Sequence, residues 1–333
     1  MATRTTRSPD PPGAPERPPL ESLLEYARLA PSSRNTQPWS FAVRGAEIRV
    51  FVDRDRWLRV ADPDQRELYL SAGCALENVL VAAAHHGYKA SVSYVKEERA
   101  DGLAAVARLE PGGKAEDRRV PLFGAIGKRH TNRRPYQRRP LPRDVMASLY
   151  AAVHDEGVQL WLLTDAETSG RVEQLLALAD RAQYSDPAYR RELAQAIGKG
   201  VFGHGWFEAA AGRLLVEHVD VGGAAARRDV ARLHSAPALA VLTSRGNDRA
   251  VQVRAGQAFE RLALTATRMG VALQPMSTLM QSPIARAAVA ELLPEEVYPQ
   301  HVFRLGYAPP DRRRVPHRPP AGLPRAAKKE SGA

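Results

Sequence analysis

Hydroxyl, carboxamide and indole side chains follow one another between residues 30 and 39, in the segment Ala-Pro-Ser-Ser-Arg-Asn-Thr-Gln-Pro-Trp. Such groups can donate and accept hydrogen bonds at the polar edge of a heterocycle, and Asn35 can do both. Flanking prolines restrict the loop, so that less reordering accompanies binding. An ordinary polar loop that caps a helix has the same composition, and composition alone favours that alternative. The candidate binding residues here are Pro31, Ser32, Ser33, Asn35 and Gln37.

A second group of candidates is the segment Arg-His-Thr-Asn-Arg at 129–133. In an extended chain alternate side chains point the same way, so two guanidinium groups would flank one hydroxyl and could clamp a phosphate. A basic loop leading into the next helix explains the spacing equally well. A further arginine follows the last predicted strand, where a solvated tail is the stronger interpretation. The candidates are Arg129, His130, Thr131 and Arg133, with Arg314 or Arg318 as a third contributor.

The periodicity of apolar residues predicts alternating helices and strands. Pro31 ends the first predicted helix, which has amphipathic spacing, and Gly87 ends the second. The expected helices cover 20–29, 65–86, 119–128, 143–155, most of 166–233, 249–269 and 284–292, and the expected strands cover 40–44, 47–53, 90–96, 103–109, 158–164, 237–243 and 301–306.

An internal repeat appears when the sequence is shifted by 183 positions against itself. Small residues at fixed helical spacing let two helices approach closely, so the repeat predicts paired central helices at a pseudo-twofold interface. Chance alignment of two alanine-rich helices is the alternative, but the repeated glutamate and the repeated glycine at the helix end favour duplication. The matches are Ala72/Ala255, Gly73/Gly256, Ala75/Ala258, Glu77/Glu260, Ala83/Ala266 and Gly87/Gly270.

Charge and cysteine usage limit the class of protein. The net charge of +11 lies largely in Pro-rich ends of the 333-residue chain, and no basic stripe carries interleaved aromatics, so we expect no nucleic-acid partner. We expect no membrane span, because no apolar run looks long enough, and the N-terminus lacks a secretory signal. Cys74 is the single cysteine, and adjacent His85 and His86 cannot chelate one ion. We therefore predict a soluble cytoplasmic protein without a metal.

Taken together, these segments resemble the nitroreductase family of FMN-dependent oxidoreductases, which carries an Arg-x-Ser-x-Arg phosphate segment and a Pro-Ser-Ser-x-Asn-x-Gln-Pro-Trp loop. Asp-Pro-Asp-Gln-Arg-Glu-Leu at 62–68 and Arg-His-Thr-Asn-Arg-Arg-Pro at 129–135 resemble the Acg group within it. The resemblance spans roughly residues 20–320. It implies an α+β nitroreductase-like fold, with two homologous halves in one chain around a pseudo-twofold axis and mixed or antiparallel sheets flanked by helices.

The same resemblance suggests a division of the chain. A disordered tail would cover 1–18, the first half 19–125, the second half 126–310 and a basic tail 311–333. Within the second half, a helical insertion at about 181–233 would lie over the flavin. Its aromatic residues would form a lid or pack as core, and they are Tyr184, Tyr189, Phe202 and Trp206.

The family places each FMN between two subunits, one holding the phosphate and the other supplying the Ser-Asn loop. Here the first half has the loop without an Arg-x-Ser/Thr-x-Arg segment, and the second half has that segment without the loop. One FMN would therefore bind across the two halves, and the other pseudo-site would be inactive. A turn after the long second-half helix would lie under the central flavin ring; its residues are Gln274, Pro275, Met276 and Ser277.

The resemblance implies an oxidoreductase in which NAD(P)H reduces FMN and the flavin reduces an electron-poor acceptor such as a nitroaromatic or a quinone. We single out no catalytic acid or base. One alternative is a protein that sequesters FMN in an occluded site with little turnover. Another is a structural protein without cofactor, against which the intact binding segments argue. Internal pairing of the halves predicts a monomer or a weak homodimer.

Overall fold

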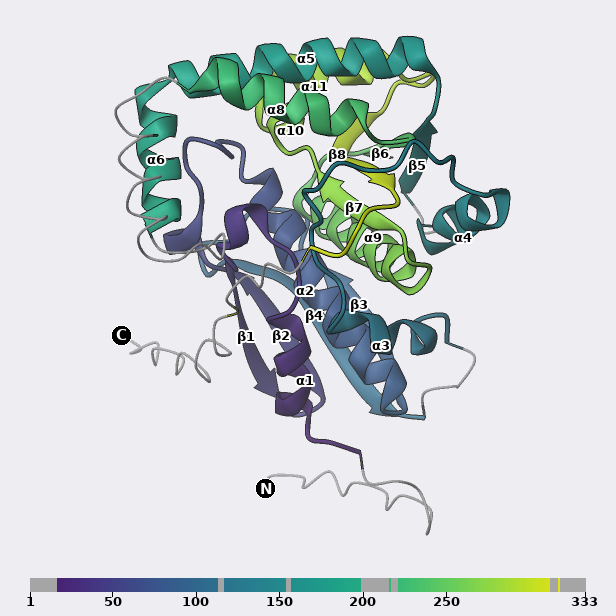
Figure 1. The fold of residues 1–333 in the computed structure, drawn as a ribbon. Coiled ribbons are helices and arrows are strands. Elements are labelled where there is room, and N and C mark those ends of the chain that lie inside the picture. Colours follow the sequence, from purple (N-terminus) through teal and green to yellow (C-terminus); the bar gives the residue numbers. More distant parts are fainter. Residues whose placement is uncertain are drawn as a thin grey trace, which may run out of the picture.

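The structure is a computed structural model that describes residues 17–112, 117–153, 157–198, 216, 221–311 and 317. Two long helices, α2 (Arg66–His85) and α9 (Arg249–Arg268), lie against each other at its centre. One four-stranded sheet lies on either side of this helix pair (Figure 1). The helix pair thus joins two halves into one continuous core.

Each half contains a sheet of the same design. The first sheet has the order β1-β2-β4-β3 and the second β5-β6-β8-β7, and all the pairings are antiparallel. In both, a long central helix connects the second strand to the third. The strands are β1 (Trp39–Arg44), β2 (Glu47–Val52), β3 (Tyr88–Tyr94), β4 (Leu103–Pro111), β5 (Val158–Leu163), β6 (Ala238–Ser244), β7 (Ala272–Pro275) and β8 (Tyr298–Gly306).

Shorter helices flank this framework. In the first half α1 precedes the sheet, and in the second half several helices separate β5 from β6 and β7 from β8. They are α1 (Leu20–Ala27), α3 (Phe123–Ile126), α4 (Arg143–Val153), α5 (Ala166–Ser185), α6 (Pro187–Gly198), α8 (Gly222–His234), α10 (Thr278–Gln281) and α11 (Pro283–Ala290), with 3-10 turns at 33–35, 54–56 and 120–122.

The crossing of α2 and α9 explains the repeated glycine. A Cβ added to Gly73 would lie 2.0 Å from the backbone oxygen of Val253, and one added to Gly256 would lie 2.0 Å from that of Leu70. Both pairs are related by the shift of 183 positions, so the two contacts are equivalent. The glycines permit a helix approach that any side chain would prevent, and the approach has local twofold symmetry.

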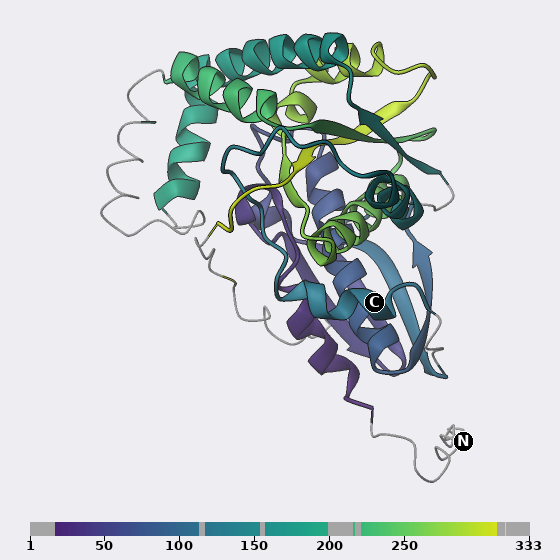
Figure 2. The same ribbon diagram turned by 45° about the vertical axis from the view of Figure 1, so that its right-hand side comes forward.

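The helices between β5 and β6 form two parts. α5 and α8 pack together with α11 over the second sheet, whereas α6 projects from this layer toward the first half (Figures 1 and 2). Leu193 of α6 packs there against Leu58 and Ala61. The helical stretch between β5 and β6 begins at Ala166, as predicted for residues 166–233.

Most predicted elements agree with the structure to within a few residues. The predicted turn at 274–277 is wrong in its first part, because Gln274 and Pro275 belong to β7 and pair with Arg304 and Phe303 of β8. Proline is tolerated there since β7 is an edge strand. The helix expected at 119–128 is divided into a 3-10 turn and the short α3.

The expectation that no segment has the length and composition of a membrane span is also corrected. α2 is long and apolar enough by those two measures alone. However, 94% of its apolar window is buried inside the protein, and it carries Arg66, Glu67 and Glu77 among its buried residues. Its apolar character is therefore that of a core helix between a sheet and a partner helix.

Candidate functional site

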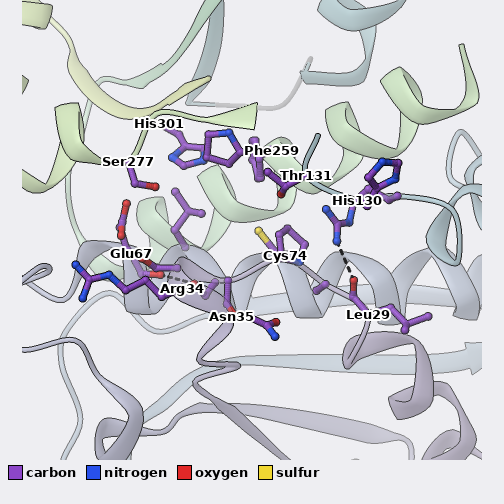
Figure 3. A pocket seen from close by; sticks show the side chains of 18 of the residues that line it. Leu29, Arg34, Asn35, Glu67, Cys74, His130, Thr131, Phe259, Ser277 and His301 are labelled. Carbon is purple, nitrogen blue, oxygen red and sulfur yellow. Dashed lines mark hydrogen bonds between the residues drawn. The ribbon is translucent and has the colours of Figure 1, made fainter. Parts of the chain in front are cut away.

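A cavity of about 930 Å³ lies between the two halves. Loop 29–35 and one face of α2 line it from the first half, and residues 127–133 with the β7–α10 junction line it from the second. Figure 3 shows Leu29 and His130 toward one end, and Glu67, Ser277 and His301 toward the other. The cavity therefore brings the two predicted binding segments together from opposite halves.

The Ser-Asn loop has an unusual backbone. Arg34, Asn35 and Gln37 adopt positive φ angles of 46°, 52° and 48°, a region that non-glycine residues rarely occupy. The hydroxyl of Ser32 accepts a hydrogen bond from the Gln37 backbone N–H at 2.9 Å, and the Thr36 hydroxyl donates to the Ser33 carbonyl at 3.1 Å. The hydroxyls thus hold the loop in a strained shape, as is common at ligand-binding sites.

The arginine segment runs beside β7 in an extended course. Asn132 points into the protein, where its backbone N–H donates to the Leu273 carbonyl at 3.1 Å and its side chain donates to the Pro309 carbonyl at 2.9 Å. Arg129, Thr131 and Arg133 line the cavity, and so does His130 between them. The two arginines and the hydroxyl thus share one cavity wall.

Arg129 also links the halves directly. It follows α3, and its backbone N–H donates to the Ala125 carbonyl at 2.8 Å. Its guanidinium donates to the Leu29 carbonyl of the first half at 3.3 Å and faces Glu260 of α9, with Nε 3.5 Å from Oε1. One cation therefore contacts the loop, the core and the cavity.

The other predicted residues fall into three groups. Side chains that line the cavity besides those above are Pro31, Ser32, Ser33, Asn35, His130, Pro275 and Ser277. Three predicted side chains do not line it. Gln37 is buried elsewhere, and Gln274 accepts a hydrogen bond from the Arg304 guanidinium at 2.7 Å. Met276 packs in the hydrophobic cluster of the second half. Arg314 and Arg318 lie outside the described residues.

One face of α2 contributes a wall that the sequence motifs did not identify. Glu67, Leu70, Ser71 and Cys74 line the cavity at spacings of three, one and three residues, which places them on one helical face. The hydrophobic pattern of α2 does not single out this face, because the helix is buried on nearly all sides. Cys74 is buried, and burial raises the pKa of its thiol well above the ordinary value, so the thiol form is favoured.

His301 of β8 and Phe259 of α9 complete the opposite wall. Their rings meet edge to face with centroids 4.4 Å apart. Burial, together with the nearby Arg66, lowers the pKa of His301 to about 3. This imidazole is therefore neutral at physiological pH and offers a hydrogen-bonding group without charge.

Helix α6 borders the cavity through Tyr189 and lies against the first half. Tyr189 lines it, with the Arg34 guanidinium 4.6 Å from its ring centre, and Tyr184 packs edge-on at 5.5 Å. Glu192 accepts hydrogen bonds from Arg34 at 3.2 Å and from the backbone N–H groups of Val60 and Ala61 at 3.0 and 3.1 Å. α6 is thus attached to the Ser-Asn loop and its neighbourhood. Of the other aromatics predicted for the insertion, Phe202 and Trp206 lie outside the described residues.

The pseudo-equivalent face of α9 differs in character. By the shift of 183 positions, Ser71 and Cys74 correspond to Arg254 and Gln257. The Arg254 guanidinium lies 4.6 Å from the ring centre of Tyr94, and the Tyr94 hydroxyl donates to Gln257 at 2.7 Å. A tyrosine therefore covers the face that corresponds to the cavity wall of α2.

Comparison with known proteins decides the family. No protein-family model matches the sequence. The chain is 32% identical over 303 residues to "Putative NAD(P)H nitroreductase Rv3131" of Mycobacterium tuberculosis, covering 87% of this chain and 85% of that protein. The chain belongs to the nitroreductase family. The chain is also 26% identical to "Putative NAD(P)H nitroreductase acg" of the same organism, and this match covers 87% of this chain and 89% of that protein. The resemblance to the nitroreductase family and its Acg group is therefore confirmed.

A solved nitroreductase-fold structure agrees. The match to the crystal structure of a putative nitroreductase from Anabaena variabilis covers 86% of this chain and 87% of that chain. It has a TM-score of 0.55 and 13% sequence identity. At this identity the likeness concerns the fold alone. It confirms the predicted nitroreductase-like α+β fold.

Proposed function

We propose that this nitroreductase-family protein is an FMN-binding, NAD(P)H-dependent oxidoreductase that reduces electron-poor acceptors such as nitroaromatics or quinones. The supporting observation is the cavity that joins the Ser-Asn loop of one half to the arginine segment of the other. Its volume of about 930 Å³ lies within the range of small-molecule and cofactor sites. The names of Rv3131 and Acg point to the same activity.

The residues that line the cavity fit FMN by their chemistry. Arg129 and Arg133 with the Thr131 hydroxyl suit a phosphate, because charge-assisted hydrogen bonds from guanidinium groups match phosphate oxygens. Asn35 and Ser33 suit the polar edge of the ring. Pro275 to Ser277 would lie under the central ring, and Arg314 or Arg318 would add to the phosphate site.

We infer one FMN per chain, held between a first half at 19–125 and a second half at 126–310. α1 and β1 are separated by the Ser-Asn loop, whereas α4 ends at Val153 and β5 begins at Val158, which leaves no room for such a loop in the second half. Tyr94 covers the equivalent face of α9. We also propose that the protein is cytoplasmic and works as a monomer or weak homodimer.

The chain contributes position and environment to the reaction. FMN, when bound, supplies the hydride chemistry between NAD(P)H and the acceptor. The arginines would hold the FMN phosphate, and the strained loop would orient the flavin ring. Tyr189 of α6 would exclude water from the part of the cavity that it lines. His301 stays neutral, so we assign it no proton transfer.

A second candidate is an FMN-sequestering protein with little turnover. The observation that favours it is α6, which lines the cavity through Tyr189 and is attached to the first half through Glu192. If α6 covers this part of the cavity, it would hinder the access of both NAD(P)H and the acceptor to the flavin. The phosphate and ring contacts would be the same in both functions.

Anaerobic titration of the FMN-loaded protein with NADPH and NADH, followed by flavin absorbance, separates these functions. Rapid bleaching supports the oxidoreductase. Flavin that remains oxidised with pyridine nucleotides and bleaches with dithionite supports sequestration. Protein that takes up no FMN would refute both, and a flavin-to-protein ratio near two would refute the single site.

A further inference from the structure

Glu77 and Glu260 occupy equivalent positions in α2 and α9, and neither is exposed to solvent. Their surroundings differ. Glu77 accepts hydrogen bonds from Arg261 at 2.7 Å and from Arg119 at 2.9 Å. Around Glu260, the position that corresponds to Arg261 is Asn78 of α2, so this second guanidinium is missing. The helix pair therefore buries two carboxylates with unequal compensation.

Arg129 is the cation that faces Glu260. Its Nε lies 3.5 Å from Glu260 Oε1, longer than the contacts of Glu77, while the same side chain lines the cavity at the proposed phosphate site. A phosphate in the cavity and the buried carboxylate would compete for one guanidinium. Among the described residues, the other titratable groups that act near this pair include Glu77 and Cys74 of α2 beside Glu260, and His317 and Arg28 beside Arg129.

We propose that Glu260 is a positioning residue: in alkaline solution its carboxylate pairs with Arg129 when no anion is bound, and it takes up one proton from solvent when FMN phosphate binds to Arg129. This inference rests on the proposed function. The physical reason is that a buried carboxylate stays charged only while an opposite charge compensates its lost hydration. A phosphate that engages Arg129 removes part of that compensation, and the carboxylate becomes the neutral acid.

The charge states of the two glutamates set the pH range of this scheme. Burial raises the pKa of Glu260 to about 8, although Arg129 opposes the increase, so in the free protein Glu260 is mainly the neutral acid at pH 7 and the carboxylate above about pH 8. Burial acts on Glu77 as well, but Arg119 and Arg261 outweigh it and lower the pKa of Glu77 to about 2. Glu77 is therefore ionised across the neutral range and serves as a matched control from the other half.

The test is the dissociation constant of FMN, measured by flavin fluorescence between about pH 7 and 9, where the phosphate is already mostly dianionic. In the wild type we expect the constant to rise with pH, approaching ~tenfold per pH unit above pH 8, since one proton is linked to binding. Glu260→Gln mimics the neutral acid. It should show little pH dependence and bind FMN more tightly than the wild type at pH 9. Glu77→Gln should keep the same limiting slope per pH unit, with its onset at lower pH, because the charge of Glu77 raises the pKa of Glu260.

Riboflavin, which lacks the phosphate, supplies a ligand control, and its affinity should not change between wild type and Glu260→Gln. Calorimetry of the wild type in buffers of different ionisation enthalpy should detect proton uptake with FMN near pH 8 and less with riboflavin, and this needs no variant to fold. Equal slopes in wild type and Glu260→Gln, or FMN binding without proton uptake, would overturn the inference alone. Absence of FMN binding at every pH would overturn the proposed function with it.

Discussion

Gly73 and Gly256 meet at the centre of the molecule, where a Cβ on either one would lie 3.0 Å from the Cα of the other. The relationship is reciprocal, because each glycine also approaches a backbone carbonyl of the opposite helix. The helices α2 and α9 carry part of the cavity wall and the equivalent buried glutamates Glu77 and Glu260. Their close approach therefore sets the geometry of the site as well as the core.

Gly73→Ala should destabilise the fold strongly. The added Cβ would lie 2.0 Å from the Val253 oxygen, and the backbone cannot yield without separating the helices. We expect a loss of about 3 kcal/mol or more in the free energy of unfolding, at the upper end for overpacked cores. Gly170→Ala in α5 is the control, because its Cβ would meet no atom within 4 Å, and it should be neutral or stabilising. Similar unfolding midpoints in urea for the two variants would contradict the crossing.

Arg129→Ala should weaken FMN binding by about 10- to 100-fold, the value of a hydrogen bond to a charged group. The expected loss concerns the phosphate, so riboflavin affinity should change little in the same variant. Arg254→Ala provides a control on α9, since Arg254 contacts Tyr94 at the equivalent face without lining the cavity. If riboflavin and FMN lose affinity equally, Arg129 acts on the shape of the cavity and not on the phosphate.

Glu77 should make the free energy of unfolding depend on pH in the acidic range. Its folded-state pKa of about 2 lies below the ordinary 4.5, so its contribution is present above about pH 4.5 and is lost as the pH falls toward 2. The contribution is on the order of 3 kcal/mol. Urea unfolding at pH 6 and pH 3 should therefore show a difference between wild type and Glu77→Gln that narrows in acid. A difference that stays constant would assign the effect to packing.

The sequence allowed the two binding segments and the repeat to be identified, because their signals are local. The alternation allowed Arg129, Thr131 and Arg133 to point one way in an extended chain, and in the structure all three line the cavity together with His130. The repeated glycine indicated a helix crossing since no other residue permits such an approach. These features depend on residue type within a few positions.

The rest of the site depends on tertiary contacts. α2 is buried on nearly all sides, so its hydrophobic pattern does not distinguish the face that carries Glu67 and Cys74. The positive φ angles of Arg34 and Asn35 are imposed by the folded loop, as non-glycine residues give no signal for them. Pro275 suggested a turn because its edge position in the sheet was not visible in the sequence.

Glu192→Ala should loosen α6 from the first half. The substitution removes the carboxylate that binds Arg34, Val60 and Ala61. Tyr189, which lines the cavity from the same helix, is then held less firmly. We expect FMN to dissociate faster by about tenfold, because charge-assisted hydrogen bonds of this kind contribute one or more kcal/mol. Stopped-flow fluorescence of released flavin measures the rate directly.

Glu173→Ala is the matched control for this experiment. Glu173 lies in α5 of the same helical stretch and pairs with His234 at 3.1 Å without lining the cavity, so its loss should leave the dissociation rate unchanged. Equal rates in wild type and Glu192→Ala would mean that α6 does not limit the exit of FMN. If the protein sequesters flavin, Glu192→Ala should also accelerate bleaching by NADPH under anaerobic conditions, because the same attachment that retains the cofactor excludes the reductant.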